Sequence, residues 1–192
     1  MKLYLKSGML NIPNTLTILR IILLPLFILK LSGGEIEQAF IVFLIAAFTD
    51  LLDGFIARKL SMITTLGQIL DPLADKIMII GGFVAIYLSD LPVQISSFFL
   101  FFVYLKEFYT ILGILAIYLF KGKVNIQPNI FGKMATFMES LTILIVLISN
   151  LTGMFALFVN YFAMATIGFI IASIVSYALD GINFMIQDEK YL

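Results

Sequence analysis

The sequence contains no cysteine and no histidine among its 192 residues, and only 12% of the residues are charged. Without cysteine there is no disulfide and no thiolate metal site. Without histidine, acid–base chemistry near neutral pH falls to carboxylates, lysine, tyrosine or water. Any metal site must be built from oxygen ligands, which favours Mg²⁺, Mn²⁺ or Ca²⁺ over Zn²⁺. Twelve basic and twelve acidic residues give no net charge, so nucleic acid is not an expected partner.

Apolar residues are abundant: 61% of the chain is hydrophobic and the mean hydropathy is +1.09. A soluble domain averages about 45–50% apolar and about 25% charged residues. This chain therefore has too little polar surface for a water-soluble fold, and lipid is the expected solvent for most of it. Its length suits a single domain over residues 1–192.

Six apolar stretches are long enough to cross a membrane, since about 20 residues of helix span the hydrocarbon layer. They cover about residues 13–31, 36–55, 70–88, 93–120, 131–150 and 155–179. None alternates like a barrel strand, so each is predicted to be a helix. The first is expected to be a span rather than a cleavable signal. We predict an all-α, polytopic membrane protein, with a six-helix bundle over 11–192 and a short interfacial helix at 1–10.

The distribution of lysine and arginine predicts the orientation of these spans. With six spans, the two termini and the loops 57–66 and 121–130 share one side of the membrane. That side carries most of the basic residues: Lys2, Lys6, Arg58, Lys59, Lys121, Lys123 and Lys190. We therefore expect both termini to be cytoplasmic and the protein to lie in the cell (inner) membrane.

Four aspartates lie where the second span ends and the third begins. Asp50 and Asp53 are three residues apart, and Asp71 and Asp75 are four apart. On helices both spacings place the side chains on one face. A short loop joins the two helices, so the two carboxylate pairs are expected to face each other across one cleft at the cytoplasmic side.

Four carboxylates in one cleft repel each other unless cations neutralise them. Two divalent ions would do so, and paired metal ions suit reactions at phosphate. A carboxylate with weak metal contact could also act as a general base. The small residues Gly54, Ala57 and Gly67 would let a bulky ligand approach the backbone, and Arg58 could make forked hydrogen bonds to a diphosphate.

Two other functions remain open from these residues. A cation transporter or channel could use the four acids as a transit site, and a non-catalytic scaffold is a third possibility. A transit route predicts acids near mid-membrane. Here they lie at one face and the far half of each span is apolar, which favours an enzyme.

The acid motif resembles the signature of the CDP-alcohol phosphotransferase family at every defined position. In this chain it reads Asp50-x2-Asp53-Gly54-x2-Ala57-Arg58-x8-Gly67-x3-Asp71-x3-Asp75. The resemblance implies transfer of a phosphatidyl group from CDP-diacylglycerol to an alcohol, with release of CMP, by a homodimeric enzyme that uses two Mg²⁺ or Mn²⁺ ions per site. It implies further that three acids are metal ligands, that Asp75 is a general base close to a metal, and that the remaining motif residues contribute to the CDP site. The three ligands are Asp50, Asp53 and Asp71.

A second stretch, Asn11-Ile12-Pro13-Asn14-x-Leu16-Thr17-x2-Arg20, resembles the start of phosphatidylglycerophosphate synthases and of CDP-lipid cardiolipin synthases. The resemblance implies that Asn14 and Thr17 help to bind the CDP-lipid. Helix N-capping is the alternative role for both. Arg20 could pair with a lipid phosphate or extend to the membrane surface.

The acceptor is less defined than the donor. Lys106 stands where the glycerophosphate branch has arginine, while two further basic positions of that branch are Ile114 and Ala135 here. Glycerol 3-phosphate, a small dianion, is the first expectation, and phosphatidylglycerol, with one charge, is the close alternative. Three cations are the candidate acceptor-binding residues: Arg20, Lys106 and Lys133.

Overall fold

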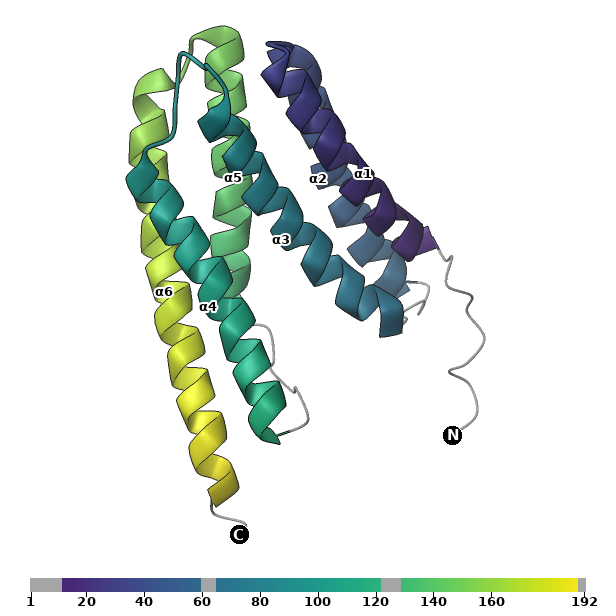
Figure 1. Ribbon diagram of the computed structural model, residues 1–192, viewed down its shortest axis with the longest axis vertical. Coiled ribbons are helices and arrows are strands. Elements are labelled where there is room, and N and C mark those ends of the chain that lie inside the picture. The colour runs from purple at the N-terminus through teal and green to yellow at the C-terminus, as the bar shows by residue number, and fades with distance from the viewer. Residues whose placement is uncertain (1–11, 60–64, 122–128, 190–192) are drawn as a thin grey trace. The chain divides into compact units, whose positions relative to one another are not determined.

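The computed structural model describes the backbone of residues 12–59, 65–121 and 129–189, and side chains within 14–53, 59, 72–113 and 129–182. The interfacial helix predicted at 1–10 lies outside these residues. Six helices follow one another (Figure 1), which confirms the all-α prediction. They are α1 (Ile12–Ser32), α2 (Ile36–Lys59), α3 (Thr65–Leu88), α4 (Ser97–Lys121), α5 (Ile130–Thr152) and α6 (Ala156–Glu189).

Three segments in the described part of the chain are long and apolar enough to cross a membrane. They are Asn14–Ser32, Ile130–Thr152 and Ala156–Ile182. Large apolar side chains also face outward, as with Leu29, which is 69% exposed, and Leu157, which is 82% exposed. Such exposure is unfavourable in water and suits a lipid environment. The count of six spans stays a prediction.

Three helices are longer than the apolar stretches that predicted them. α2 runs on to Lys59, α3 begins at Thr65 rather than near residue 70, and α6 continues from 179 to Glu189. Polar residues continue a helix once an apolar run has formed it, because only the membrane-crossing part needs hydrophobic side chains. Apolar composition therefore located the helices but not their ends: it placed these three too short, and it began the fourth near residue 93 although α4 begins at Ser97.

The described residues form two compact units. One comprises residues 1–94 and 147–154, and the other comprises residues 95–146 and 155–192. Helix α5 contributes its last turns to the first unit and the rest to the second.

In the first unit, α1 packs against both α2 and α3. Phe27 and Phe43 are buried with their ring centroids 5.7 Å apart, and Phe83 from α3 is also buried. Gly81 lets α3 approach Leu24 of α1, since a β-carbon there would lie 2.7 Å from Leu24 Cδ2. Helix α1 is thus the element on which α2 and α3 are assembled.

Two turns fix the connections of this unit. Gly34 has φ +77° and donates its N–H to Leu31, while Glu35 donates to Lys30, which is the Schellman ending of a helix. Asn150, at the end of α5, exchanges two 2.9 Å hydrogen bonds with the backbone of Val93. These contacts satisfy backbone groups that the helix ends leave without partners.

In the second unit, α4 packs against α6. Its buried apolar residues include Phe99 and Val103 of α4, Ile143 of α5 and Ile170 of α6. A hydrogen bond of 3.0 Å between the hydroxyls of Thr142 and Thr166 joins α5 to α6. Polar contacts between apolar helices fix their register without a charge.

Candidate active site

One guanidinium gathers three of the four motif acids. Arg20, on α1, forms ion pairs with Asp50 and Asp53 of α2 and with Asp75 of α3. The pair with Asp50 joins Nη2 to Oδ1 at 2.8 Å. Because α1 packs on both other helices, its side chain can reach acids that lie 25 residues apart along the chain. The predicted convergence of acids from the second and third helices is therefore present in the structure, with an arginine between them.

The three acids differ in their access to solvent. The side chain of Asp53 is 6% exposed, whereas those of Asp50 and Asp75 are 46% and 39% exposed. The carboxyl group of Asp75 also lies within hydrogen-bonding reach of Asp50. The cluster therefore has a closed side at Asp53 and an open side, where Asp50 and Asp75 are accessible to a ligand.

Thr17 and Asn14 lie on the same helix as Arg20 and are both buried. Thr17 Oγ1 is 3.5 Å from Asp53 Oδ2, so Thr17 faces the acid cluster. The alternative role for these two residues, helix N-capping, is wrong, because α1 already begins at Ile12 and both residues lie inside it. Binding near the cluster stays the prediction for both residues, and the contact of Thr17 with Asp53 supports it for Thr17.

The charge of the cluster bears on whether a divalent ion fits it. Three carboxylates against one guanidinium leave two negative charges, which is the charge of one divalent cation. Carboxylate oxygens are the ligands that Mg²⁺ prefers. Among the described residues no three acids are already arranged as a metal site, since Arg20 lies between them. The donor set fits a divalent ion in chemistry, and its net negative charge favours binding of a cation.

The remaining motif residues are placed only by their helices. Gly54, Ala57 and Arg58 belong to the last turns of α2, and Gly67 and Asp71 belong to the first turns of α3. Their side chains lie outside the described part of the structure, so the roles predicted for them stay predictions.

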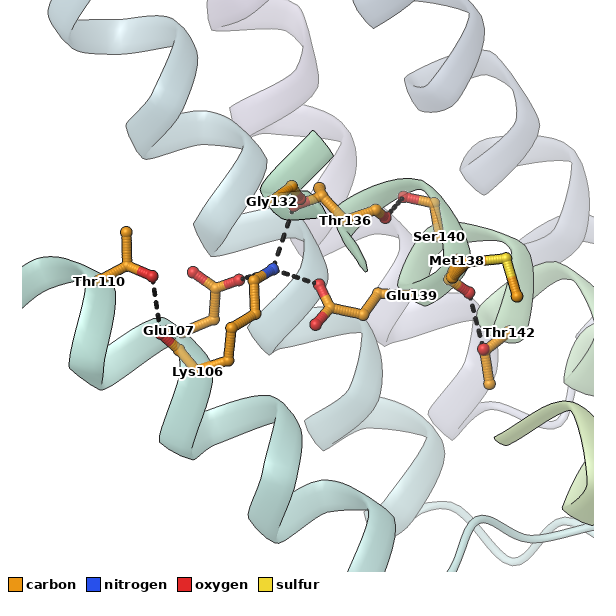
Figure 2. A network of polar contacts seen from close by, with 9 residues as sticks. All are labelled: Lys106, Glu107, Thr110, Gly132, Thr136, Met138, Glu139, Ser140 and Thr142. Carbon is orange, nitrogen blue, oxygen red and sulfur yellow. Dashed lines mark hydrogen bonds and ion pairs between the residues drawn. The ribbon is translucent and has the colours of Figure 1, made fainter. Parts of the chain in front are cut away.

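A second polar cluster lies in the other unit (Figure 2). Lys106 Nζ is 2.7 Å from Glu107 Oε1, 2.8 Å from Glu139 Oε2 and 3.1 Å from Thr136 Oγ1. All three charged residues are at most 3% exposed. Lysine has three N–H donors, and each has an acceptor here. This ammonium therefore ties α4 to α5.

This network bears on the predicted acceptor residues. An acceptor phosphate at Lys106 would have to replace one of its present oxygen partners. Lys133, by contrast, is exposed. Glu139 accepts a hydrogen bond from Lys106, in line with the structural role that its position on an apolar helix favours.

Comparison with known proteins identifies the chain. The model of the CDP-alcohol phosphatidyltransferase family matches residues 10–181, which include both polar clusters. The chain belongs to this family. The match covers most of the sequence, and it confirms the family to which the aspartate motif pointed.

Several relatives within the CDP-alcohol phosphatidyltransferase family carry the same name, CDP-diacylglycerol--glycerol-3-phosphate 3-phosphatidyltransferase. One from Aquifex aeolicus is 31% identical over 180 residues, covering 93% of this chain and 99% of the relative. One from Bacillus subtilis is 29% identical and covers 74% of this chain and 79% of its own length. One from Wigglesworthia glossinidia brevipalpis is 47% identical over 81 residues, 40% of this chain.

Two contacts of this CDP-alcohol phosphatidyltransferase were missed by reasoning from the sequence. Arg20 was expected to meet a phosphate, but it pairs with the acids, and Lys106 was expected to meet an acceptor, but it pairs with Glu139, 33 residues away. The small number of charged residues in the sequence was the signal that could have predicted these ion pairs. In so apolar a chain, each charge inside a helix needs a partner, and few are available.

Proposed function

We propose that this protein transfers the phosphatidyl group of CDP-diacylglycerol to glycerol 3-phosphate, giving phosphatidylglycerophosphate and CMP in phospholipid biosynthesis. The observation that carries the proposal is the convergence of Asp50, Asp53 and Asp75 on one point, in a chain of this family. The relatives' shared name supplies the two substrates.

In the reaction, a hydroxyl oxygen of the acceptor bonds to the β-phosphorus of the CDP-lipid, the one that bears diacylglycerol. The bond from this phosphorus to the bridging oxygen breaks, and that oxygen leaves with CMP. Asp75 takes the proton of the attacking hydroxyl. Its 39% exposed side chain can reach a substrate, as a general base must.

The carboxylates of Asp50, Asp53 and Asp71 would hold Mg²⁺ or Mn²⁺, with Asp75 close by. Two such ions, when bound, would neutralise the diphosphate and the charge that develops on the leaving oxygen. The chain's own contribution is to hold these oxygens together at the end of α2 and the start of α3.

Six further residues are proposed to bind the CDP-lipid. Arg58 would make forked hydrogen bonds to the diphosphate, and small residues on both helices would admit the nucleotide beside the backbone. Thr17, which contacts Asp53, and Asn14, which is buried on the same helix, complete the set. The small residues are Gly54, Ala57 and Gly67.

For the acceptor, Lys133, Arg20 and Lys106 are proposed as the cations that hold its charge. Lys133 is exposed and accessible, whereas the other two would exchange an internal carboxylate for the acceptor phosphate. Phosphatidylglycerol is the second candidate acceptor, because Ile114 and Ala135 replace two basic residues of the glycerophosphate branch.

We place the enzyme in the cell membrane as a homodimer with six spans and both termini in the cytoplasm. The active site then faces the cytoplasm, where soluble acceptor and nucleotide are available. The excess of basic residues on that side supports this orientation.

A CMP-release assay with purified protein tests the proposal. The reaction contains CDP-diacylglycerol, Mg²⁺ or Mn²⁺, and glycerol 3-phosphate, phosphatidylglycerol, inositol phosphate or serine in turn. We expect CMP only with metal, and fastest release with glycerol 3-phosphate. If CMP is released fastest with phosphatidylglycerol, the protein is assigned to cardiolipin synthesis instead. If no acceptor releases CMP, the proposed function is refuted. Liposomes lacking substrate should show no Mg²⁺ flux.

A further inference from the structure

Arg20 has an unusual arrangement for a buried arginine. Arginine commonly binds one carboxylate through two parallel hydrogen bonds. Here Nη1 pairs with Asp75, and Nη2 pairs with both Asp50 and Asp53. Its Nε has no hydrogen-bond partner in the described part of the chain. The side chain is divided among carboxylates from two helices rather than matched to one of them.

The oxygens that hold Arg20 are the ones that a divalent ion would need. Asp50 and Asp53 are proposed metal ligands, and each is within ion-pair distance of the same Nη2. A guanidinium nitrogen and a metal ion cannot occupy the same space between these oxygens. The side chain is only 2% exposed, so it lies inside the protein between these carboxylates.

We propose that Arg20 is an exchangeable counter-cation, which holds the three carboxylates together in the metal-free protein and leaves them when a divalent ion binds. The inference rests on the proposed function only in that these carboxylates are the metal ligands. It makes Arg20 a positioning residue for the metal site. Once displaced, its guanidinium is available to a phosphate beside the same site.

A competing internal cation weakens metal binding. Only molecules in which Arg20 has left can bind the ion, so the apparent dissociation constant rises by the inverse of their fraction. If the paired arrangement outweighs the open one tenfold, the apparent affinity falls about tenfold.

The test measures Mn²⁺ binding by purified protein in detergent, without CDP-lipid or acceptor, from the paramagnetic resonance signal of free Mn²⁺. The variants are Arg20→Gln and Arg20→Lys, with Lys30→Gln as the control. Lys30 pairs with Glu35 at 3.1 Å in an exposed position away from the acids. We expect Arg20→Gln to bind Mn²⁺ about tenfold more tightly than the wild type and the control to be unchanged.

The Arg20→Lys variant shows whether a change in Mn²⁺ affinity comes from the exchange of Arg20 for the metal ion or only from the loss of a positive charge. Lysine keeps the positive charge, but its compact ammonium lacks the two separate nitrogens with which the guanidinium reaches carboxylates on both α2 and α3. Exchange therefore predicts an affinity between those of the wild type and Arg20→Gln. Wild-type affinity in Arg20→Lys would overturn the proposal. If Arg20→Gln does not fold, the comparison of Mn²⁺ affinity between Arg20→Lys and the wild type still tests the proposal.

Thermal unfolding provides a second readout. With a chelator, Arg20→Gln should melt below the wild type, because three carboxylates then lack their cation. Saturating Mn²⁺ should reduce the difference in melting temperature between Arg20→Gln and the wild type. An unchanged difference would count against the exchange of Arg20 for the metal ion. A protein that releases no CMP but shows these effects would refute the proposed function alone. If the enzyme is active but its Mn²⁺ affinity is the same in the wild type, Arg20→Gln and Arg20→Lys, the exchange alone is refuted.

Discussion

Replacing Lys106 by methionine tests the buried network of the second unit. Methionine is similar in length and apolar, so the substitution removes a charge without opening a large cavity. It leaves two carboxylates, Glu107 and Glu139, at most 3% exposed and without the cation that lies within 2.8 Å of both. Removing one partner of a buried ion pair costs about 3–5 kcal/mol. At about 2–4 °C per kcal/mol for a chain of this size, the melting temperature should fall by roughly 10 °C.

The network carries one lysine and two glutamates, so removing one acid should have a different effect. Glu107→Gln leaves a one-to-one pair of Lys106 with Glu139, and the new amide oxygen can still accept from the lysine. The expected change is within about 1 kcal/mol. This asymmetry between lysine and glutamate substitutions follows from the charge count and not from volume.

Lys30→Met provides a matched control. It removes the lysine of a partly exposed pair with Glu35, which should cost less than about 1 kcal/mol. The assay is thermal unfolding of each variant in the same detergent, followed by CMP release as a function of glycerol 3-phosphate. If Lys106→Met melts with the wild type, the structural role argued from its burial is refuted, whereas a raised KM for glycerol 3-phosphate supports the acceptor role proposed for the same residue.

Other predictions concern single sites. Gly132→Ala should cost about 1–3 kcal/mol in unfolding free energy, because its β-carbon would overlap the hydroxyl of Tyr177. Adding Tyr177→Phe removes that hydroxyl and should restore part of the loss; no recovery would mean that the hydroxyl contact is not the cause. Gly153→Ala should cost about 1–2 kcal/mol, since φ is +69° there, and an unchanged melting temperature would exclude that strain. Asp75→Asn should abolish CMP release while CDP-lipid still binds in a pull-down, and near wild-type turnover would refute its role as the base.

The sequence predicted the six helices well, because segments of about 20 apolar residues can satisfy their backbone in lipid only as helices. It predicted less well where they end. Composition stops being informative once a helix leaves the apolar layer, as α6 does between residue 179 and Glu189. Gly34 and Gly153 follow the ends of α1 and α5, and both adopt the positive φ that helix ends favour.

Within the site, the spacing of the acids predicted which carboxylates would meet, but not what would meet them. Asp50 and Asp53 share a face of α2 because helical geometry is local, and the short connection between α2 and α3 predicted that Asp75 would lie opposite them. Arg20 joins them only through the packing of α1, a long-range contact that residue spacing does not encode. The motif therefore identified the family and the acids, whereas the ion pairs required the structure.

The central claim is that the carboxylates of α2 and α3 hold the catalytic metal. Anomalous diffraction from crystals of the protein grown with Mn²⁺ tests it most directly. We predict anomalous density among the carboxylates of Asp50, Asp53, Asp71 and Asp75, with the guanidinium of Arg20 moved away from them. Mn²⁺ bound elsewhere, or Arg20 still paired with its three acids in an active, Mn²⁺-saturated crystal, would contradict the account.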